Sequence, residues 1–460
     1  MEQRRRDQGA DRLTPTGAET GRAIVIEPWL KQSTPRGSAR DADIRTPEAR
    51  LEEAAGLARA IDLNVVEQGL VTLNEIRPAT YIGKGKVDEI AGLVKSLEVS
   101  VVIMDCPVSP VQQRNLEKTW GAKVIDRTGL ILEIFGRRAR TREGALQVEL
   151  AHLSYQKTRL VRAWTHLERQ RGGFGFLGGP GETQIEADRR VIGERIARIE
   201  DELEKVKRTR TLHRESRKRV PYPIVALVGY TNAGKSTLFN RMTQATVLSA
   251  DMLFATLDPT LRAVDLPHGS RVILSDTVGF ISDLPTMLVA AFRATLEEVI
   301  EADVILHVRD IAHEDAAAQS RDVAQVLEEL GIAPADPRLI EVWNKVDQMD
   351  AEGREQLVNL AERQPAERRP AIVSALTGEG MDALVRAVEA RLSQSRQTLS
   401  VSLDPADGAG LSWLYRHSEV LTRDTREDGT LALTVRADAK NAEMVRRRYA
   451  AAMLEARSPD

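Results

Sequence analysis

The sequence predicts an α/β protein whose largest domain is a doubly wound, mostly parallel sheet with helices on both faces. Short apolar runs, which we expect to be buried strands, alternate with helical patterns from residue 221 to residue 393. The string GYTNAGKS at residues 229–236 follows the first of these runs and precedes a helical pattern, which is the context of a phosphate-binding loop. A small α/β domain with a long antiparallel helical hairpin is expected before this sheet, and a small α+β domain after it.

The glycine-rich string fits G-x-x-x-x-G-K-[ST] at every fixed position. Its backbone N–H groups would wrap the phosphates, and Gly229 and Gly234 would keep side chains out of their way. Lys235 would place an ammonium on the β- and γ-phosphates, and the Ser236 hydroxyl would bind the Mg²⁺ that bridges them. The residues expected to bind the nucleotide here are Gly229, Tyr230, Thr231, Asn232, Ala233, Gly234, Lys235, Ser236 and Thr237.

Two further strings have the properties of the switch segments of a GTPase. Phe254-Ala255-Thr256-Leu257-Asp258 offers the Thr256 hydroxyl, which can complete the Mg²⁺ shell while the γ-phosphate is present. Asp276-Thr277-Val278-Gly279 offers Asp276 as a carboxylate support for Mg²⁺ and the Gly279 N–H as a donor to the γ-phosphate. Lys235, Thr256 and Gly279 are therefore the predicted catalytic residues.

Two more strings, each at an expected strand end, predict that the base is guanine. They are Asn344-Lys345-Val346-Asp347 and Ser374-Ala375-Leu376. The Asp347 carboxylate would accept hydrogen bonds from the ring N–H and the exocyclic amine of guanine, whereas adenine lacks that amine. Lys345 would cover the base, Asn344 would tie the base loop to the phosphate loop, and the Ala375 N–H would bind the guanine O6. The sequence thus predicts a P-loop GTPase domain with GTP as substrate and Mg²⁺ as cofactor.

Phe280 follows Gly279 at a position where GTPases of the Ras type commonly have a glutamine that orients the attacking water. A phenyl ring cannot hydrogen-bond that water. We therefore expect hydrolysis to be slow unless another residue or a partner positions the water.

The amino-terminal part is predicted to contain a tail and a small domain. Residues 1–46 are rich in polar and small residues, with one apolar island at 23–26, and are predicted to be a flexible tail. Residues 47–140 are predicted to be the small α/β domain, with helices at 47–61, 84–97 and 109–120 and strands at 63–68, 99–104 and 122–125. Gly83-Lys84-Gly85-Lys86 is compatible with a second phosphate loop, but a basic glycine turn is favoured because the spacing of the first loop is missing.

Residues 141–220 are predicted to form the helical hairpin, because apolar residues recur at heptad spacing on both sides of a glycine-rich stretch. Phe174, Phe176 and Leu177 lie in that stretch and suggest a contact surface at the tip; the alternative is that they fold back onto the hairpin. Arginine and lysine cluster along the hairpin, which fits either binding to a phosphate backbone or a solvated face.

The remaining elements follow from the same patterns. Within the GTPase domain at 221–393, strands are expected at 224–228, 262–266, 272–275, 304–308, 339–343 and 371–374, and helices at 236–242, 286–301, 315–330, 353–363 and 380–391. Residues 394–460 combine an alternating strand at 431–435 with helical patterns on either side, which predicts the α+β domain.

The composition, with 42% hydrophobic and 29% charged residues, is typical of a globular protein. No apolar run approaches the roughly 18 residues of a membrane-spanning helix, and the first residues lack the apolar core of a signal peptide. Cys106 is the single cysteine, so no disulfide within the chain is expected. We expect a cytoplasmic monomer, with neither a membrane nor DNA as a partner.

The chain resembles bacterial HflX-type GTPases over about residues 47–392. The resemblance rests on YIGKGK at 81–86, QRNLE at 113–117, DRT at 126–128, GPGETQ at 179–184 with DRR at 188–190, and FATLDPT at 254–260. It implies binding to the large ribosomal subunit and its RNA, GTP hydrolysis stimulated there, and dissociation or rescue of stalled ribosomes under stress.

The resemblance also implies that the hairpin tip, with Phe174, Phe176 and Leu177, contacts ribosomal RNA, although Phe176 and Leu177 stand where more polar residues are expected. Two alternatives remain open on the residues alone. One is a GTPase associated with RNA remodelling or RNA modification that acts off the ribosome. The other is a protein that uses the nucleotide only as a structural ligand.

Overall fold

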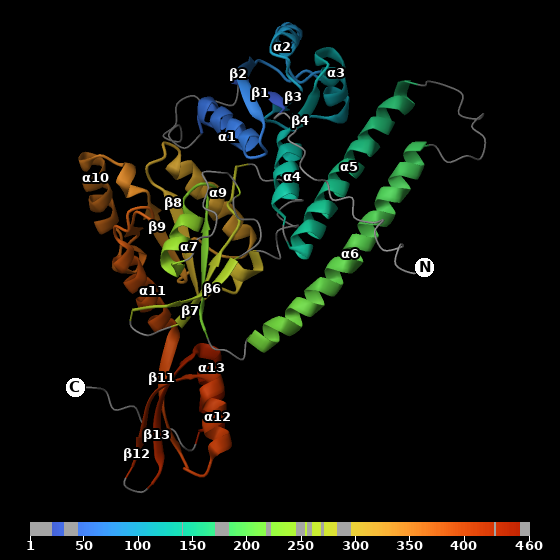
Figure 1. Ribbon diagram of the computed structural model, residues 1–460. Helices are drawn as coiled ribbons and strands as arrows, with labels where there is room; N and C mark the ends of the chain where they lie inside the picture. Colours follow the sequence, from blue (N-terminus) through green and yellow to red (C-terminus); the bar gives the residue numbers. More distant parts are fainter. Residues whose placement is uncertain are drawn as a thin grey trace, which may run out of the picture. The chain divides into compact units, whose positions relative to one another are not determined.

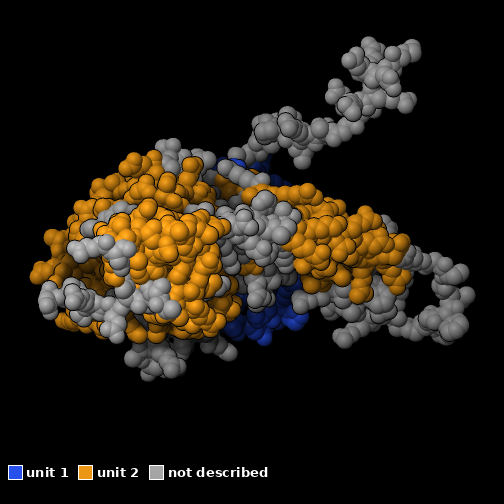
Figure 2. Space-filling model, turned by 90° about the horizontal axis from the view of Figure 1, so that it is seen from below, with its two compact units in different colours: residues 1–41, 46–133 blue, residues 42–45, 134–460 orange. Residues whose placement is uncertain are grey.

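The computed structural model describes residues 21–31, 45–139, 141–170, 184–217, 222–244, 254, 260–267, 271–282, 296–426 and 429–450. The chain divides into two compact units, one formed by residues 1–41 and 46–133 and the other by residues 42–45 and 134–460 (Figure 2). Among the helices so described, none is long and apolar enough to cross a membrane.

The first unit is built on a parallel sheet with the strand order β2-β1-β3-β4 (Figure 1). Its strands are β1 (Arg22–Leu30), β2 (Asn64–Leu73), β3 (Val101–Met104) and β4 (Lys123–Asp126), and helices α1 (Pro47–Arg59), α2 (Lys84–Ser96) and α3 (Pro110–Trp120) connect them. Thr46 and Ser109 cap α1 and α3 with their hydroxyl groups, and a proline follows each cap. Gly83 precedes α2, so the basic residues at 84–86 form the first turn of a helix. All six elements expected between residues 47 and 126 are present.

The prediction of a flexible tail over residues 1–46 is wrong for Arg22–Leu30. These residues form β1, which lies between β2 and β3 in the sheet, and its apolar island at 23–26 is buried. The island is too short to bury its surface against its sequence neighbours, but parallel pairing with two later strands covers it. Residues 1–20 and 32–44 of the predicted tail lie outside the described residues. Helix α4 (Arg127–Arg138), which follows β4, is a second element that the patterns do not predict.

The predicted helical hairpin is confirmed as two long helices, α5 (Arg142–Gln170) and α6 (Gln184–Arg217), which lie side by side (Figure 1). The buried residues of the seam between them are Leu146, Ile199 and Leu203. Ion pairs join Arg142 to Glu202 and Arg195 to Glu149. Because residue numbers rise along one helix as they fall along the other, the two helices are antiparallel.

A six-stranded sheet with the order β10-β9-β8-β5-β7-β6 forms the centre of the second unit, and only β6 runs antiparallel to its neighbour among these strands. The strands are β5 (Ile224–Gly229), β6 (Thr260–Asp265), β7 (Arg271–Asp276), β8 (Val304–Asp310), β9 (Leu339–Asn344) and β10 (Ala371–Ile372). The helices are α7 (Lys235–Thr243), α9 (Ala316–Glu329), α10 (Ala351–Glu362) and α11 (Met381–Ser395). This is the doubly wound sheet that the sequence predicts. Of the helix expected at 286–301, the described residues 296–300 are helical.

A second, antiparallel sheet with the order β11-β13-β12 forms the carboxyl-terminal domain. Its strands are β11 (Arg396–Leu403), β12 (Glu419–Thr425) and β13 (Leu431–Asp438), and its helices are α12 (Gly408–His417) and α13 (Ala439–Arg448). Val401, Leu414 and Val435 belong to its own buried core. The expected strand at 431–435 lies within β13. The prediction missed β11, although Leu399, Val401 and Leu403 alternate with polar residues there and are buried in the core of this domain, and it also missed β12.

Candidate functional site

The predicted phosphate loop joins β5 to α7, and two of its positions require glycine. Gly229 has a φ of +152°, and a Cβ there would overlap the carbonyl oxygen of Val308 on β8. Gly234 has a φ of +91°, and a Cβ there would overlap the amide nitrogen of Asn344. Both glycines therefore allow neighbouring strand ends to approach the loop, which places it at the carboxyl edge of the sheet.

Lys235 and Gly279, two of the three predicted catalytic residues, lie together. Lys235 is buried, and its Nζ donates hydrogen bonds to the carbonyl oxygens of Gly229 at 3.1 Å and Tyr230 at 2.7 Å. Burial lowers the pKa of this ammonium to about 8. A Cβ on Gly279 would stand 3.0 Å from Lys235 Nζ and 2.9 Å from the Cα of Thr231, so only glycine fits between them. Thr256, the third catalytic candidate, lies outside the described residues.

Ser236 and Asp276 form a second close pair. The Ser236 hydroxyl donates to Asp276 Oδ2 at 2.8 Å, and the carboxylate is buried at the end of β7. Thr277, the next residue, is anchored by its hydroxyl to the carbonyl oxygen of Leu227 on β5. A hydroxyl and a carboxylate are ligands of the type that Mg²⁺ prefers, and Mg²⁺ commonly takes its other ligands from water and phosphate. The pair therefore fits the predicted cofactor, although no group of three or more His, Cys, Asp or Glu suited to a metal occurs in the described part of the chain.

Phe280 is held against the phosphate loop by its backbone. Its N–H donates to the carbonyl oxygen of Gly229 at 3.1 Å, and its carbonyl oxygen accepts from Thr231 N–H at 2.7 Å. Its ring is buried, with 1% of its surface exposed. The ring is therefore shielded from solvent.

Asn344 connects the phosphate loop to the predicted base loop. Its Nδ2 donates to the carbonyl oxygen of Ala233 at 2.8 Å, and its Oδ1 accepts from Ala375 N–H at 2.9 Å. Ser374 fixes the following turn, since its Oγ accepts from Thr377 N–H at 3.0 Å. The link that the sequence predicts for Asn344 is thus present in the geometry.

Lys345 and Asp347 follow Asn344 in the loop that the sequence predicts to bind the base. Lys345 adopts a left-handed conformation with a φ of +66°, and its Nζ pairs with Asp310 Oδ2 at the end of β8, at 2.8 Å. Val346 is buried, whereas Asp347, in the short 3₁₀ helix η3 (Val346–Gln348), is half-buried. Leu376 at the far end of the base loop is exposed.

Arg241 is a contributor that the motifs do not reveal. It lies in the last turn of α7, and its Nε donates to the carbonyl oxygen of Ala375 at 2.6 Å. Its Nη2 donates to the next carbonyl, that of Leu376. A Cβ on Gly378 would come within 2.6 Å of the same guanidinium. The base loop is therefore clamped on its carbonyl side by Arg241 and on its amide side by Asn344, and no local spacing could have indicated the arginine.

Of the first switch string, residues 254–258, the structure describes Phe254. This residue is buried and has a φ of +56°. Its ring meets Phe135 of α4 edge-on, with 4.7 Å between the ring centroids and 70° between the planes. Ala255, Thr256, Leu257 and Asp258 lie outside the described residues, and so do Phe174, Phe176 and Leu177 of the hairpin tip.

Four family models match successive parts of the chain. They are described as "GTP-binding GTPase N-terminal" over residues 48–136, "GTP-binding GTPase Middle Region" over 138–217, "50S ribosome-binding GTPase" over 224–345 and "HflX C-terminal domain" over 359–457. The sequence is 49% identical over 389 residues to GTPase HflX of Magnetococcus marinus, which covers 85% of this chain and 88% of that protein. The chain belongs to the HflX family of GTPases. It is therefore a GTP hydrolase.

The chain is also similar to further HflX relatives. GTPase HflX of Escherichia coli is 48% identical over 359 residues, which covers 78% of this chain and 83% of the relative. A GTP-binding protein of Sulfolobus solfataricus, solved in complex with GDP, is 22% identical with a TM-score of 0.43 and covers 81% of this chain and 99% of that chain.

Proposed function

We propose that this GTPase binds the large ribosomal subunit and uses GTP binding and hydrolysis to dissociate or rescue stalled ribosomes. The observation that carries the proposal is the match of residues 224–345 to a family model described as a 50S ribosome-binding GTPase, within a chain that matches HflX proteins over most of its length. The cytoplasm is the proposed location, because that is where ribosomes are.

In the nucleotide site, we assign the phosphates to the loop and the base to the two strings at the ends of β9 and β10. Lys235 and the Gly279 N–H would meet the γ-phosphate, and their proximity supports this role. Asp347 would accept two hydrogen bonds from guanine, while Lys345 covers the base from its pairing with Asp310. The Ala375 N–H already donates to Asn344 in this structure, so its predicted bond to the guanine O6 would have to share or replace that bond.

Ser236 and Asp276 would hold Mg²⁺, with Thr256 completing the set, as the hydroxyl–carboxylate pair suggests. The ion, when bound, neutralises charge on the β- and γ-phosphates. This chain's own residues orient the phosphate chain through the loop amides and through Lys235. Because Phe280 is buried and apolar, no side chain at that position positions the attacking water, and hydrolysis in isolation is expected to be slow.

The helical hairpin is the proposed ribosome-binding arm. Arg189 and Arg198 of α6 have exposed side chains, and such charges favour contact with RNA phosphates. Part of the charge on the arm is used internally, because Arg190 pairs with Glu194 and Arg195 with Glu149. We assign the tip residues Phe174, Phe176 and Leu177 to the contact with ribosomal RNA on the strength of the family resemblance.

Sedimentation with ribosomal subunits tests the proposal. The protein should co-sediment with large subunits when loaded with a non-hydrolysable GTP analogue and remain in the supernatant with GDP. Lys235→Ala should abolish ribosome-stimulated phosphate release, whereas Arg363→Ala, at an exposed position after α10, should leave it unchanged. Sedimentation that is independent of the nucleotide would count against a GTP-driven ribosome factor.

A second arm of the same experiment tests the hairpin tip. Replacing Phe174, Phe176 and Leu177 together by serine should weaken ribosome dissociation and leave the affinity for GTP unchanged, since the tip is separate in sequence from every nucleotide motif. Equal loss of ribosome action and of GTP affinity would refute the tip assignment.

A further inference from the structure

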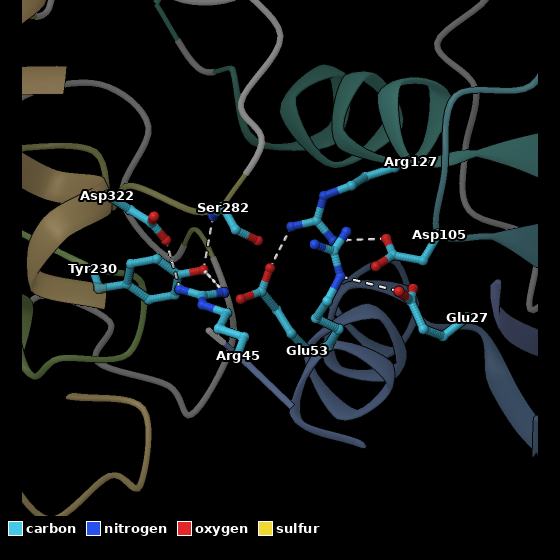
Figure 3. A network of polar contacts seen from close by, with 9 residues as sticks. Glu27, Arg45, Glu53, Asp105, Arg127, Tyr230, Ser282 and Asp322 are labelled. Carbon is cyan, nitrogen blue, oxygen red and sulfur yellow. Dashed lines mark hydrogen bonds and ion pairs between the residues drawn. The ribbon is translucent and has the colours of Figure 1, made fainter. Parts of the chain in front are cut away.

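Tyr230, the second residue of the phosphate loop, links three parts of the nucleotide site. Its carbonyl oxygen accepts the hydrogen bond from Lys235 Nζ. Its backbone pairs with Phe280 in a parallel bridge. Its hydroxyl oxygen accepts from the backbone N–H of Ser282 at 2.8 Å (Figure 3). The segment at 280–282, which directly follows Gly279, is therefore attached to the phosphate loop at both ends. The Tyr230 hydroxyl holds Ser282, and the backbone of Gly229 and Thr231 holds Phe280.

Arg45 holds the side chain of Tyr230. Its Nη1 donates to the Tyr230 hydroxyl at 2.7 Å, and its guanidinium carbon lies 4.7 Å from the centre of the tyrosine ring (Figure 3). Its Nη2 pairs with Asp322 Oδ2 of α9 at 2.8 Å. The Arg45 side chain is 9% exposed, so these interactions are largely shielded from water. Charge-assisted hydrogen bonds are stronger in such a shielded environment than in water.

The place of Arg45 in the chain is distinctive. It immediately precedes Thr46, the cap of α1, yet Arg45 groups with the unit that contains the GTPase sheet, while Thr46 and helix α1 group with the other unit. Arg45 thus reaches the phosphate loop from 185 residues away in the sequence. No nucleotide motif includes it.

We propose that Arg45 is a positioning residue for GTP hydrolysis, which acts through Tyr230 and the backbone of Ser282 to keep Gly279 beside Lys235. Because Arg45 holds the tyrosine ring in place, the Tyr230 hydroxyl oxygen is held where it accepts from the Ser282 N–H. Both ends of the segment at 280–282 are then attached to the phosphate loop, Ser282 through this bond and Phe280 through its backbone. A donor that is already in place when the γ-phosphate gains charge lowers the barrier more than one that must first be ordered.

The inference rests on the proposed roles of Lys235 and Gly279 at the γ-phosphate. GDP has no γ-phosphate for the Gly279 N–H to meet, so loss of Arg45 should act on the chemical step and spare GDP binding. A merely structural role would instead lower the affinity for GDP and GTP alike.

The test compares kcat for GTP and the Kd for GDP in Arg45→Ala, Arg45→Lys and Tyr230→Phe. We expect kcat to fall about tenfold in Arg45→Ala, with the Kd for GDP unchanged within about twofold. Tyr230→Phe removes the hydrogen bonds that the hydroxyl makes with Arg45 and Ser282, and it should lower kcat by a similar or larger factor. The double variant Arg45→Ala/Tyr230→Phe should have a kcat little below that of Tyr230→Phe, because both substitutions remove the same interaction. Arg59→Ala, at an exposed position of α1, is the matched control and should match the unaltered protein.

An unchanged kcat in Arg45→Ala, or additive losses in the double variant, would overturn the inference. Parallel loss of GDP binding would do so as well, because it would indicate a structural role. If Arg45→Ala does not fold, Asp322→Asn removes the ion pair and keeps the arginine, and it should give a smaller loss of kcat with the same sparing of GDP. Lys235→Ala distinguishes failure of the proposed nucleotide site from failure of the role of Arg45. If Lys235→Ala hydrolyses GTP at the full rate, the site assignment itself is refuted. If Lys235→Ala loses hydrolysis but Arg45→Ala has normal kinetics, only the role of Arg45 is refuted.

Discussion

Asn344 donates a hydrogen bond from its Nδ2 to the carbonyl oxygen of Ala233, over 2.8 Å. The other end of the same amide accepts from the Ala375 N–H, so one buried side chain joins the phosphate loop to the base loop. The two loops to which we assign the phosphates and the base are therefore connected, so a change in one loop should affect binding at the other.

Asn344→Ala should weaken the binding of GTP and GDP together, by about 10- to 100-fold, because it leaves a buried carbonyl and a buried N–H without this partner. Equilibrium titration with fluorescent analogues of both nucleotides measures the effect. Asn359→Ala, at an exposed position of α10, is the control and should bind both normally. A loss confined to GTP would contradict a connection made at the base side of the site.

Asp347→Asn should move the preference of the site from guanine toward xanthine nucleotides. The amide can donate where the carboxylate only accepts, and xanthine carries a carbonyl where guanine carries its amine. A change of about 100-fold or more in the ratio of the Kd values for XDP and GDP is expected. Asp382→Asn, at an exposed position of α11, should leave the ratio unchanged. Retained selectivity for guanine in Asp347→Asn would show that another residue reads the amine.

Arg241→Ala should speed GDP release. The guanidinium holds the carbonyl oxygens of Ala375 and Leu376, and without it the loop that carries the Ala375 N–H loses these two contacts on its carbonyl side, while Asn344 still holds it on its amide side. We expect the dissociation rate of GDP to rise about 5- to 10-fold, the cost of losing a charge-assisted hydrogen bond. Stopped-flow displacement of a fluorescent GDP measures the rate, and Arg386→Ala at an exposed position of α11 is the control. An unaltered rate in Arg241→Ala would mean that Asn344 alone sets the position of the loop.

Some of these residues can be predicted from the sequence, and others cannot. The glycines, Lys235 and Asp276 can be predicted because a local string fixes both their identity and their place at a strand end. Arg241 and Arg45 cannot, because each contacts residues more than a hundred positions away and stands in no diagnostic spacing. The same limit explains the error over β1, whose partners β2 and β3 come later in the chain.

Ile26→Ala tests the place of β1. Ile26 is 1% exposed and pairs with Gly69 of β2 and Met104 of β3, so its truncation should leave a cavity in the core of the first unit. We expect the free energy of opening of that unit to fall by about 2–5 kcal/mol. Hydrogen exchange of the β3 amides reports it without requiring the whole chain to unfold in one step. Ile76→Ala, which removes a half-exposed side chain, should have little effect, and normal protection of β3 in Ile26→Ala would restore the tail interpretation.

Glu27 of β1 lies in a buried cluster of charges (Figure 3). Its Oε1 accepts from Arg50 Nε at 3.0 Å, while Arg127 pairs with Asp105 and Glu53. Burial and the neighbouring Asp105 carboxylate raise the pKa of Glu27 to about 8, against the opposing effect of the two arginines. The folded unit thus keeps Glu27 protonated at pH values where the unfolded chain, with a pKa of 4.5, has lost the proton.

The sign of the pH dependence follows from that difference. Between about pH 4.5 and pH 8 the folded state binds the extra proton, so stability contributed by Glu27 is complete below pH 4.5 and is lost as the pH rises through 8. Protection of the β3 amides against hydrogen exchange, corrected for the intrinsic rate, should therefore decline from pH 5 to pH 8. Glu27→Gln, which stays neutral and can still accept from Arg50, should flatten this decline and be the more stable protein at pH 8. Glu89→Gln, at an exposed position of α2, is the control and should show the same decline in protection as the unaltered protein. A decline of equal slope in Glu27→Gln would mean that another group carries the proton.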